Sequence, residues 1–305
     1  MAWLRRKRPT RWAVVVASPS GDAGEQWGDT WFGRDLVEAL NRQGQAASLV
    51  YRGGASTEAR DKDDVVLVLR GLRRVTPRRA GNTWLLWVIS HPELVDDGEI
   101  SEYDAAFAAS STWKSGSVSP LLQATNPQRF MPGAAQPDTG ERFLFVGSTR
   151  GEYRPIVRDA ISAGIPLGVY GVGWGEFIPA EFIRGEFMPN GDLPAAYAGA
   201  GVVLNDHWRE MAADGFLSNR LFDAVSSGAR VVSDEAAGLT EVFGDAVVTY
   251  SSADQLGRIL NAPFESVFVD QSRRTENAAR IAAEHSFDAR AAELIEAAQR
   301  IRGAE

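Results

Sequence analysis

The sequence predicts an α/β protein built from two doubly wound parallel-sheet domains. Short, continuously apolar runs predict strands that are buried on both faces, and the amphipathic segments between them predict helices that cover a parallel sheet. This alternation starts at residue 12, stops in a proline-, glycine- and polar-rich stretch at 126–141, and starts again at residue 142. A chain of 305 residues is long enough for two such domains, each with its own core.

The first half contains one well-marked helix among six apolar strands. The helix is expected at 31–44, because Phe32, Leu36 and Leu40 recur on one side and Gly44 provides a stop. The strands are expected at 12–18, 46–51, 64–70, 84–90, 104–110 and 118–125. We therefore predict a first Rossmann-like domain at 1–130, followed by a linker at 131–141.

The second half repeats the pattern and predicts a second Rossmann-like domain at 142–285. Its strands are expected at 142–148, 166–171, 201–205, 229–234 and 246–250, with helices at 154–164, 193–200 and 218–225. A final helix at about 287–302 lies within a C-terminal segment, 286–305. In open parallel sheets ligands bind beyond the carboxyl ends of the strands, so residues that follow strands are the candidates for a site.

The segment from Gly201 to Asp234 carries the strongest functional signal, because it reads strand, loop, helix, strand. Ser218 and Asn219 stand where the helix begins, and a helix that opens after a parallel strand presents unpaired N–H groups to an anion. Asp223 lies about one turn further on, where a carboxylate can accept hydrogen bonds from ribose hydroxyls. The segment predicts a nucleotide-linked ligand, although Ser218 and Asn219 also fit a plain helix cap.

Arginines and glycines near other strand ends extend this predicted phosphate site. Gly147 permits close approach of the backbone, and Arg150, Arg154 and Arg220 offer donors to phosphate oxygens. The alternatives are a solvated helix start for Arg150 and Arg154, and a structural ion pair for Arg220. Residues expected near the nucleotide or the donor sugar are Gly171, Trp174, Asp206, His207 and Asp214. Trp174 fits core packing as well as stacking on the nucleotide, and Asp206 and Asp214 fit the surface as well as the sugar.

His91 is the strongest catalytic candidate. It follows an apolar strand and precedes Pro92, and histidine readily exchanges a proton near neutral pH. The alternative is a hydrogen-bonded structural histidine. Asp29 follows the first strand and is a second candidate for a base, unless it caps the helix expected near Trp31.

Seven short motifs, each at a strand end, together resemble the CgeB-like glycosyltransferases of the GT-B superfamily. They are "WGDTWF" (27–32), "LWVISHPE" (86–93), "LLQATNPQRFMP" (121–132), "LFVGSTRGEYR" (144–154), "VYGVGW" (169–174), "LNDHW" (204–208) and "GFLSNRLFDA" (215–224). The resemblance runs nearly end to end and is specific for the family rather than for a substrate.

The resemblance implies a fold and an activity. Two Rossmann-like domains would face each other across a cleft, the second binding a nucleotide sugar and the first a glycan, lipid-linked or small-molecule acceptor, as in polysaccharide biosynthesis. Relatives usually carry Glu where this chain has Asp223, and a histidine matching His91 contacts the sugar or the acceptor hydroxyl. No metal or other cofactor is expected. Whether transfer retains or inverts configuration stays open, as do a sugar-nucleotide epimerase and a non-catalytic binding module.

Composition narrows the function classes further. A net charge of −8 argues against a nucleic-acid partner, and the absence of cysteine fits a reducing cytoplasm. Basic groups at 5–11 and 70–79 fit either solvated segments or an anionic surface, and Trp3, Leu4 and Trp12 suggest peripheral contact with the inner face of a membrane. The "DKDD" run at 61–64 precedes its strand, so we expect a solvated loop there instead of a metal site.

Overall fold

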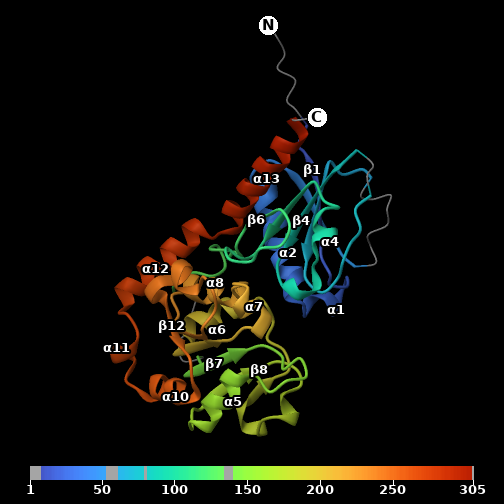
Figure 1. Cartoon of the computed structure of the whole chain (residues 1–305). Helices are drawn as coiled ribbons and strands as arrows, with labels where there is room; N and C mark the ends of the chain where they lie inside the picture. The colour runs from blue at the N-terminus through green and yellow to red at the C-terminus, as the bar shows by residue number, and fades with distance from the viewer. Residues whose placement is uncertain (1–7, 53–60, 79–80, 134–139, 304–305) are drawn as a thin grey trace. The chain divides into compact units, whose positions relative to one another are not determined.

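The computed structural model divides into two compact α/β units, which Figure 1 shows in order along the chain. It describes residues 8–52, 61–78, 81–133 and 140–303. Unit 1 comprises 1–109, 114–121 and 287–305, and unit 2 comprises 110–113 and 122–286. Each unit is described by itself.

Unit 1 contains a six-stranded, wholly parallel sheet in the order β2-β1-β3-β4-β5-β6. Its central strands β3 and β4 are buried along their whole length, as their unbroken apolar sequences predicted. The order reverses between β1 and β3, which makes that point the topological switch of the sheet. The strands are β1 (Arg11–Val15), β2 (Ala46–Val50), β3 (Val65–Arg70), β4 (Thr83–Val88), β5 (Ala105–Ala108) and β6 (Val118–Pro120).

The last helix of the chain packs within unit 1. Phe287 at its start meets Phe32 of α2 edge to face, with ring centroids 4.8 Å apart, and Asp288 accepts two hydrogen bonds from Arg42. The helices of unit 1 are α1 (Asp22–Glu25), α2 (Gly28–Arg42), the 3₁₀ turn η1 (Pro92–Leu94), α4 (Asp97–Ile100) and α13 (Phe287–Gly303).

Unit 2 contains a second parallel sheet, ordered β12-β11-β10-β7-β8-β9, whose switch point lies between β7 and β10. Side chains alternate along its strands. Leu144 and Val203 enter one apolar cluster, whereas Phe145 and Leu204 enter another. The sheet is therefore covered on both faces. Its strands are β7 (Phe143–Val146), β8 (Leu167–Tyr170), β9 (Ile183–Gly185), β10 (Val202–Asn205), β11 (Val231–Asp234) and β12 (Val247–Tyr250).

Two groups of helices cover the two faces of this sheet. Helices α6, α8 and α12 pack together on one side, and α5 packs with α10 on the other (Figure 1). The helices are α5 (Pro155–Ser162), α6 (Leu193–Gly199), α7 (Arg209–Ala213), α8 (Asn219–Ser226), α9 (Leu239–Phe243), α10 (Ala253–Asn261), α11 (Phe264–Val267) and α12 (Gln271–Glu284). Short 3₁₀ turns are η2 (Trp174–Glu176), η3 (Ala180–Phe182) and η4 (Gly244–Ala246).

The structure differs from the sequence prediction where the chain passes from unit 1 to unit 2. The change comes at residue 122, and the predicted strand at 118–125 stops at Pro120. Asn126 is buried, and Phe130 joins the core cluster of unit 2. The sequence did not predict this packing, because the segment is rich in proline and polar residues and shows no regular spacing of apolar residues. Of the predicted linker, residues 134–139 lie outside the described part of the chain.

The basic groups of the first half are only partly available to an external anion. Trp12 lies in β1 with 1% exposure, which contradicts its predicted role at a membrane surface. Arg70 is buried in an ion pair with Glu99, and Asp64 of the expected solvated loop accepts hydrogen bonds from Arg8. Residues 1–7, with Trp3, Leu4 and the first basic residues, lie outside the described chain, as does Arg79. No helix in the described residues is long and apolar enough to cross a membrane.

Candidate functional site

Most predicted donor-site residues of unit 2 follow β7 or β10, the two strands that flank the switch point. Gly147 comes directly after β7, and Asp206 and His207 come directly after β10. Because β7 and β10 pair in parallel, their carboxyl ends lie at the same edge of the sheet. The topology therefore brings together residues that are about 60 positions apart in the sequence.

The loop after β7 is held tightly against the loop after β8. Gly147 donates its amide to the carbonyl of Tyr170, at 2.8 Å, and its own carbonyl accepts a hydrogen bond from Trp174 Nε1, also at 2.8 Å. A Cβ at Gly171 would overlap the Gly147 carbonyl, and Gly171 has a φ of 145°, so only glycine fits there. The Trp174 ring is 1% exposed and meets Phe145 edge to face, which corrects the predicted stacking on a nucleotide to core packing.

Helix α8 begins close to this loop. Ser218 is its N-cap residue, but the serine side chain makes no capping hydrogen bond, so the plain-cap alternative does not describe it. The amides of Asn219 and Arg220 are the first of the helix and have no intrahelical acceptor. The Arg220 guanidinium lies against Gly147, where an added Cβ would be 2.9 Å from Nη2, and it donates to Asn205 Oδ1 at 3.0 Å.

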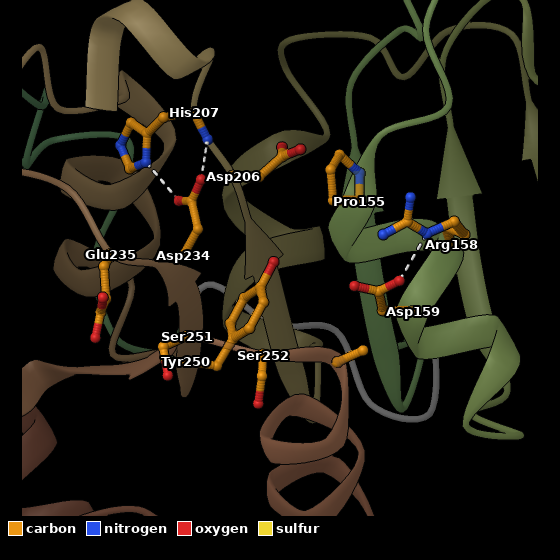
Figure 2. A pocket seen from close by; sticks show the side chains of 11 residues that line it. Pro155, Arg158, Asp159, Asp206, His207, Asp234, Glu235, Tyr250, Ser251 and Ser252 are labelled. Atoms are coloured by element: carbon orange, nitrogen blue, oxygen red, sulfur yellow. Dashed lines mark hydrogen bonds and ion pairs between the residues drawn. The ribbon is translucent and has the colours of Figure 1, made fainter. Parts of the chain in front are cut away.

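His207 is bound on both ring nitrogens and its side chain is fully buried. Nδ1 lies 2.6 Å from Asp234 Oδ1, and Nε2 accepts the backbone N–H of Ser218 at 3.1 Å (the first pair is drawn in Figure 2). These partners fit one neutral tautomer, with the proton on Nδ1. His207, predicted to touch the sugar or phosphate, instead ties the end of β11 to the start of α8.

Arg154 and Asp206 were predicted to bind a phosphate and a sugar, respectively, but they bind each other. Arg154 Nε and Nη2 donate to the two carboxylate oxygens of Asp206 at 2.9 and 2.5 Å, and both side chains are at most 8% exposed. A paired, buried arginine has little capacity left for a ligand. The ion pair joins the start of α5 to the end of β10, and we assign it a structural role.

Arg150 remains on the surface of the same loop. It is exposed, and its guanidinium carbon lies 5.3 Å from the centre of the Trp208 ring. Arg150 and His91 are the two non-glycine residues with positive φ in the described chain, at 54° and 55°. Such strain is uncommon outside turns and functional sites, and sequence reasoning had selected both residues.

Two buried polar atoms at this edge of the sheet have no hydrogen-bond partner among the described residues. They are Trp208 Nε1, a donor, and Asn219 Oδ1, an acceptor. Buried polar groups are nearly always satisfied by protein, water or ligand. Each of the two atoms is therefore open to a hydrogen bond from water or from a ligand.

Asp223 already has two partners in the structure. Its Oδ1 accepts from Thr125 Oγ1 and its Oδ2 from Asn219 Nδ2, each at 2.8 Å, and the residue is 8% exposed. Its carboxylate therefore holds the 122–133 segment against α8. A ribose contact of this carboxylate stays a prediction.

Asp214 is half-buried, and its backbone carbonyl accepts hydrogen bonds from Ser110 Oγ at 2.5 Å and Thr112 Oγ1 at 3.0 Å. Gly215 follows with a φ of 72°, and a Cβ there would meet Thr112. These contacts fix the turn that precedes α8. A contact between the Asp214 carboxylate and a sugar stays a prediction.

In unit 1, the predicted catalytic residues lie beside the switch point between β1 and β3. A Cβ added at Gly71, after β3, would be 3.3 Å from Ser90 Oγ and 3.5 Å from Asp29 Oδ2. Helix α2 begins at Gly28, so Asp29 lies inside its first turn and does not cap it as the alternative supposed. His91 follows Ser90, is 21% exposed, and places Nδ1 2.9 Å from Glu93 Oε1.

Sequence reasoning did not select the carboxylate partners of the two histidines. Asp234 ends the strand β11, and Glu93 lies two residues after His91, so position at a strand end was an available signal for both. What it could not indicate is which histidine each carboxylate meets, since Asp234 and His207 are 27 residues apart.

Comparisons with known proteins agree with this architecture. Residues 150–296 match the family model described as glycosyl transferase-like. AviGT4, a glycosyltransferase involved in avilamycin A biosynthesis, is 17% identical, with 97% of this chain and 99% of that chain covered and a TM-score of 0.69. Sucrose-phosphate synthase from Thermosynechococcus elongatus is 13% identical, with coverages of 97% and 100% and a TM-score of 0.68.

HepE from Anabaena, solved in complex with UDP-glucose, is 11% identical, with coverages of 94% and 100% and a TM-score of 0.63. No curated protein matches the chain. At these identities the solved structures show the fold alone. Together with the two six-stranded parallel sheets, they confirm the predicted GT-B architecture.

Proposed function

We propose that the chain is a glycosyltransferase of the GT-B fold, which takes its sugar from a nucleoside diphosphate bound at the switch point of unit 2. The observation that carries this proposal is the first turn of α8, whose amides at Asn219 and Arg220 have no intrahelical acceptor and whose Arg220 guanidinium lies against Gly147 in the loop after β7. Amides at a helix start, together with a guanidinium, form a site for phosphate oxygens.

The two unpartnered atoms fit the same ligand. A phosphate oxygen can accept from Trp208 Nε1, and a ribose or sugar hydroxyl can donate to Asn219 Oδ1. A nucleotide sugar carries both kinds of group. Arg220 is held by Asn205 and packed against the Phe145 ring, so its charge is oriented before a ligand arrives.

These groups would act on the bond between the sugar and the diphosphate. As that bond breaks, negative charge develops on the leaving phosphate, and preorganised N–H donors and guanidinium groups stabilise it. The amides of Asn219 and Arg220, the Arg220 side chain and the exposed Arg150 are the proposed contributors. We further propose that this charge is carried without a bound metal ion, which activity in the presence of a chelator would test.

His91 is the proposed proton acceptor for the acceptor hydroxyl. In the proposed tautomer, Nδ1 carries the proton and donates a hydrogen bond to Glu93 Oε1, which leaves Nε2 as the acceptor nitrogen. Asp29, near Gly71 and Ser90, is the second candidate for that role. In an inverting reaction one of the two takes the proton, and in a retaining reaction the leaving phosphate can take it.

We also propose the family branch of the enzyme, the kind of acceptor and the pathway. The seven sequence motifs support the CgeB-like branch and a glycan, lipid-linked or small-molecule acceptor, in a cytoplasmic pathway of polysaccharide biosynthesis. Peripheral membrane contact is proposed for the basic N-terminus without Trp12, which is buried. Incubation with donor alone distinguishes transfer from epimerisation, and binding without turnover would favour the non-catalytic module.

A pair of glycine substitutions tests the donor site. In Gly147→Ala the new Cβ would lie 2.9 Å from Arg220 Nη2 and 3.2 Å from the buried Phe145 ring, so the flexible end of the Arg220 side chain has to move most. Gly175→Ala is the matched control, because nothing lies within 4 Å of its added Cβ. Thermal shift against UDP-, GDP-, ADP- and TDP-sugars reports binding, since a ligand of the native state raises the Tm.

We expect one nucleotide class to raise the Tm of the wild type and of Gly175→Ala, and to lose most of its effect on Gly147→Ala. Loss of one charge-assisted hydrogen bond corresponds to roughly a tenfold or greater loss of affinity. An undiminished shift in Gly147→Ala would show that the nucleotide binds elsewhere.

A further inference from the structure

A second hollow in unit 2 lies between the starts of α5 and α10, at the carboxyl ends of β10, β11 and β12. Its volume is about 440 Å³. Figure 2 shows the side chains that surround it, which come from Pro155, Arg158, Asp159, Asp206, His207, Asp234, Glu235, Tyr250, Ser251, Ser252 and Ala253. The first turn of α8 is not among them, so this hollow is distinct from the proposed diphosphate site.

Tyr250 is the unusual member of this lining. The residue is 7% exposed, yet no described residue hydrogen-bonds its hydroxyl. The hydroxyl points into the hollow, toward the space between Asp206, Asp234 and Asp159 (Figure 2). The ring is buried, but the hydroxyl is not among the buried side-chain atoms without a partner, so it is accessible from the hollow and can bond a ligand there.

The charges around the hydroxyl define what that ligand can be. Asp206 is neutralised by Arg154, and Asp159 accepts a hydrogen bond from Arg158 at 2.7 Å. Asp234, bound by the neutral His207, and Glu235 contribute negative charge that no arginine in the lining offsets. Burial and the carboxylates of Asp234, Asp206 and Asp159 raise the pKa of Tyr250, so its hydroxyl stays protonated and available as a donor.

We propose that this hollow binds a hydroxylated organic cation, such as an amino sugar, with Tyr250 donating to a ligand oxygen and Asp234 and Glu235 facing its ammonium group. An anion would meet uncompensated carboxylates and is excluded. The described residues contain no cluster of ligating side chains that could hold a metal ion, so an organic cation is the candidate. The inference rests on the lining of the hollow and does not depend on the donor site at α8.

Three monosaccharides of equal ring size test the charge preference. Glucosamine, glucose and glucuronate are titrated separately into the full-length protein, and binding is followed by chemical-shift changes of unit 2 amides near Tyr250. We expect glucosamine to bind several-fold more tightly than glucose, and glucuronate to cause no change at these residues. Equal binding of the three sugars, or no response to glucosamine in the millimolar range, would overturn the proposal.

Tyr250→Phe tests the hydroxyl itself. We expect this variant to bind glucosamine roughly three- to tenfold more weakly, because one hydrogen bond is lost, while its ligand-free Tm is unchanged or higher. Tyr103→Phe is the matched control in unit 1, because the Tyr103 hydroxyl does have a partner, the carbonyl of Val75. That variant should have a lower Tm and unchanged glucosamine binding.

The two readouts separate binding from folding. A lower Tm for Tyr250→Phe with unchanged affinity would show that the hydroxyl is structural, and would refute the assignment. Nucleotide-sugar binding at α8 should be the same in Tyr250→Phe and the wild type, so failure of the donor-site proposal would be recognised independently.

Discussion

The two units each contain a histidine that follows a strand and contacts a carboxylate. The two histidines differ in how many of their ring nitrogens are bonded within the fold. His207 in unit 2 has both ring nitrogens engaged, by Asp234 and by the Ser218 amide, and its side chain is 0% exposed. His91 in unit 1 has one nitrogen beside Glu93, is 21% exposed, and has no described partner on Nε2.

The difference indicates that His207 holds other groups in position, whereas His91 is a candidate catalytic residue. A histidine whose donor and acceptor are both used inside the fold has no site left for a substrate proton. A histidine with one nitrogen oriented by a carboxylate and the other accessible has the arrangement that general-base catalysis needs. His91 also adopts a left-handed backbone conformation, which costs free energy that a purely structural role does not explain.

His91→Ala should give the largest effect. We expect kcat to fall by about 10²- to 10⁴-fold, the usual contribution of general acid–base catalysis, with little change in Tm. Initial rates of sugar transfer and a thermal melt measure the two quantities. A rate within a few-fold of wild type would remove His91 from catalysis and would favour Asp29 or the leaving phosphate as proton acceptor.

His207→Ala should act on stability. The substitution leaves the Ser218 N–H without its acceptor, which costs about 1–3 kcal/mol, whereas Asp234 keeps hydrogen bonds from the backbone N–H of residue 207 and from Ser233 Oγ. For a unit of this size the Tm should fall by roughly 4–12 °C. Donor KM should rise as the first turn of α8 loosens. A stable variant with a reduced kcat alone would mean that the two histidines have been assigned the wrong way round.

Ser218→Pro and Ser218→Ala sharpen the assignment of His207. Ser218 has a φ of −60°, which proline adopts, so Ser218→Pro removes the N–H bonded to His207 Nε2 without forcing φ to change. We expect a loss of about 1–2 kcal/mol in the free energy of unfolding, measured by urea titration. Ser218→Ala keeps the amide, and because the side chain makes no cap bond it should cost less than about 0.5 kcal/mol. Equal stability of the two variants would show that the hydrogen bond to His207 contributes nothing.

Glu93→Gln should give the smallest change in activity. Glutamine keeps an oxygen that can accept from His91 Nδ1, so the tautomer is retained, but the negative charge that stabilises the protonated ring is lost. Because Glu93 is 39% exposed, solvent screens that charge, and we expect roughly a three- to tenfold decrease in kcat. The initial rate of sugar transfer measures this decrease, and a thermal melt checks that the fold is kept. A kcat equal to that of the wild type would mean that Glu93 does not assist His91.

Much of the fold and part of the site follow from the sequence. Apolar runs predicted ten of the parallel strands within a few residues, because buried strands leave an unbroken hydrophobic pattern. Sequence also selected His91, Arg150 and the start of α8, because positions after strands are recognisable without a structure. It misjudged 122–133, where Asn126 and Phe130 are buried in a segment whose composition resembles a linker.

The sequence by itself determined the two-domain α/β architecture and which residues stand at strand ends, because both depend on local hydrophobic patterns. Only the tertiary structure decided which of those residues meet. It pairs Arg154 with Asp206, His207 with Asp234 and the Ser218 amide, and Asp223 with Thr125, and it gives the Tyr250 hydroxyl no hydrogen bond from any residue that the structure describes. These pairings join residues that are 11 to 98 positions apart in the sequence. Their distances in space depend on the order of strands in the sheet, which no local sequence pattern encodes.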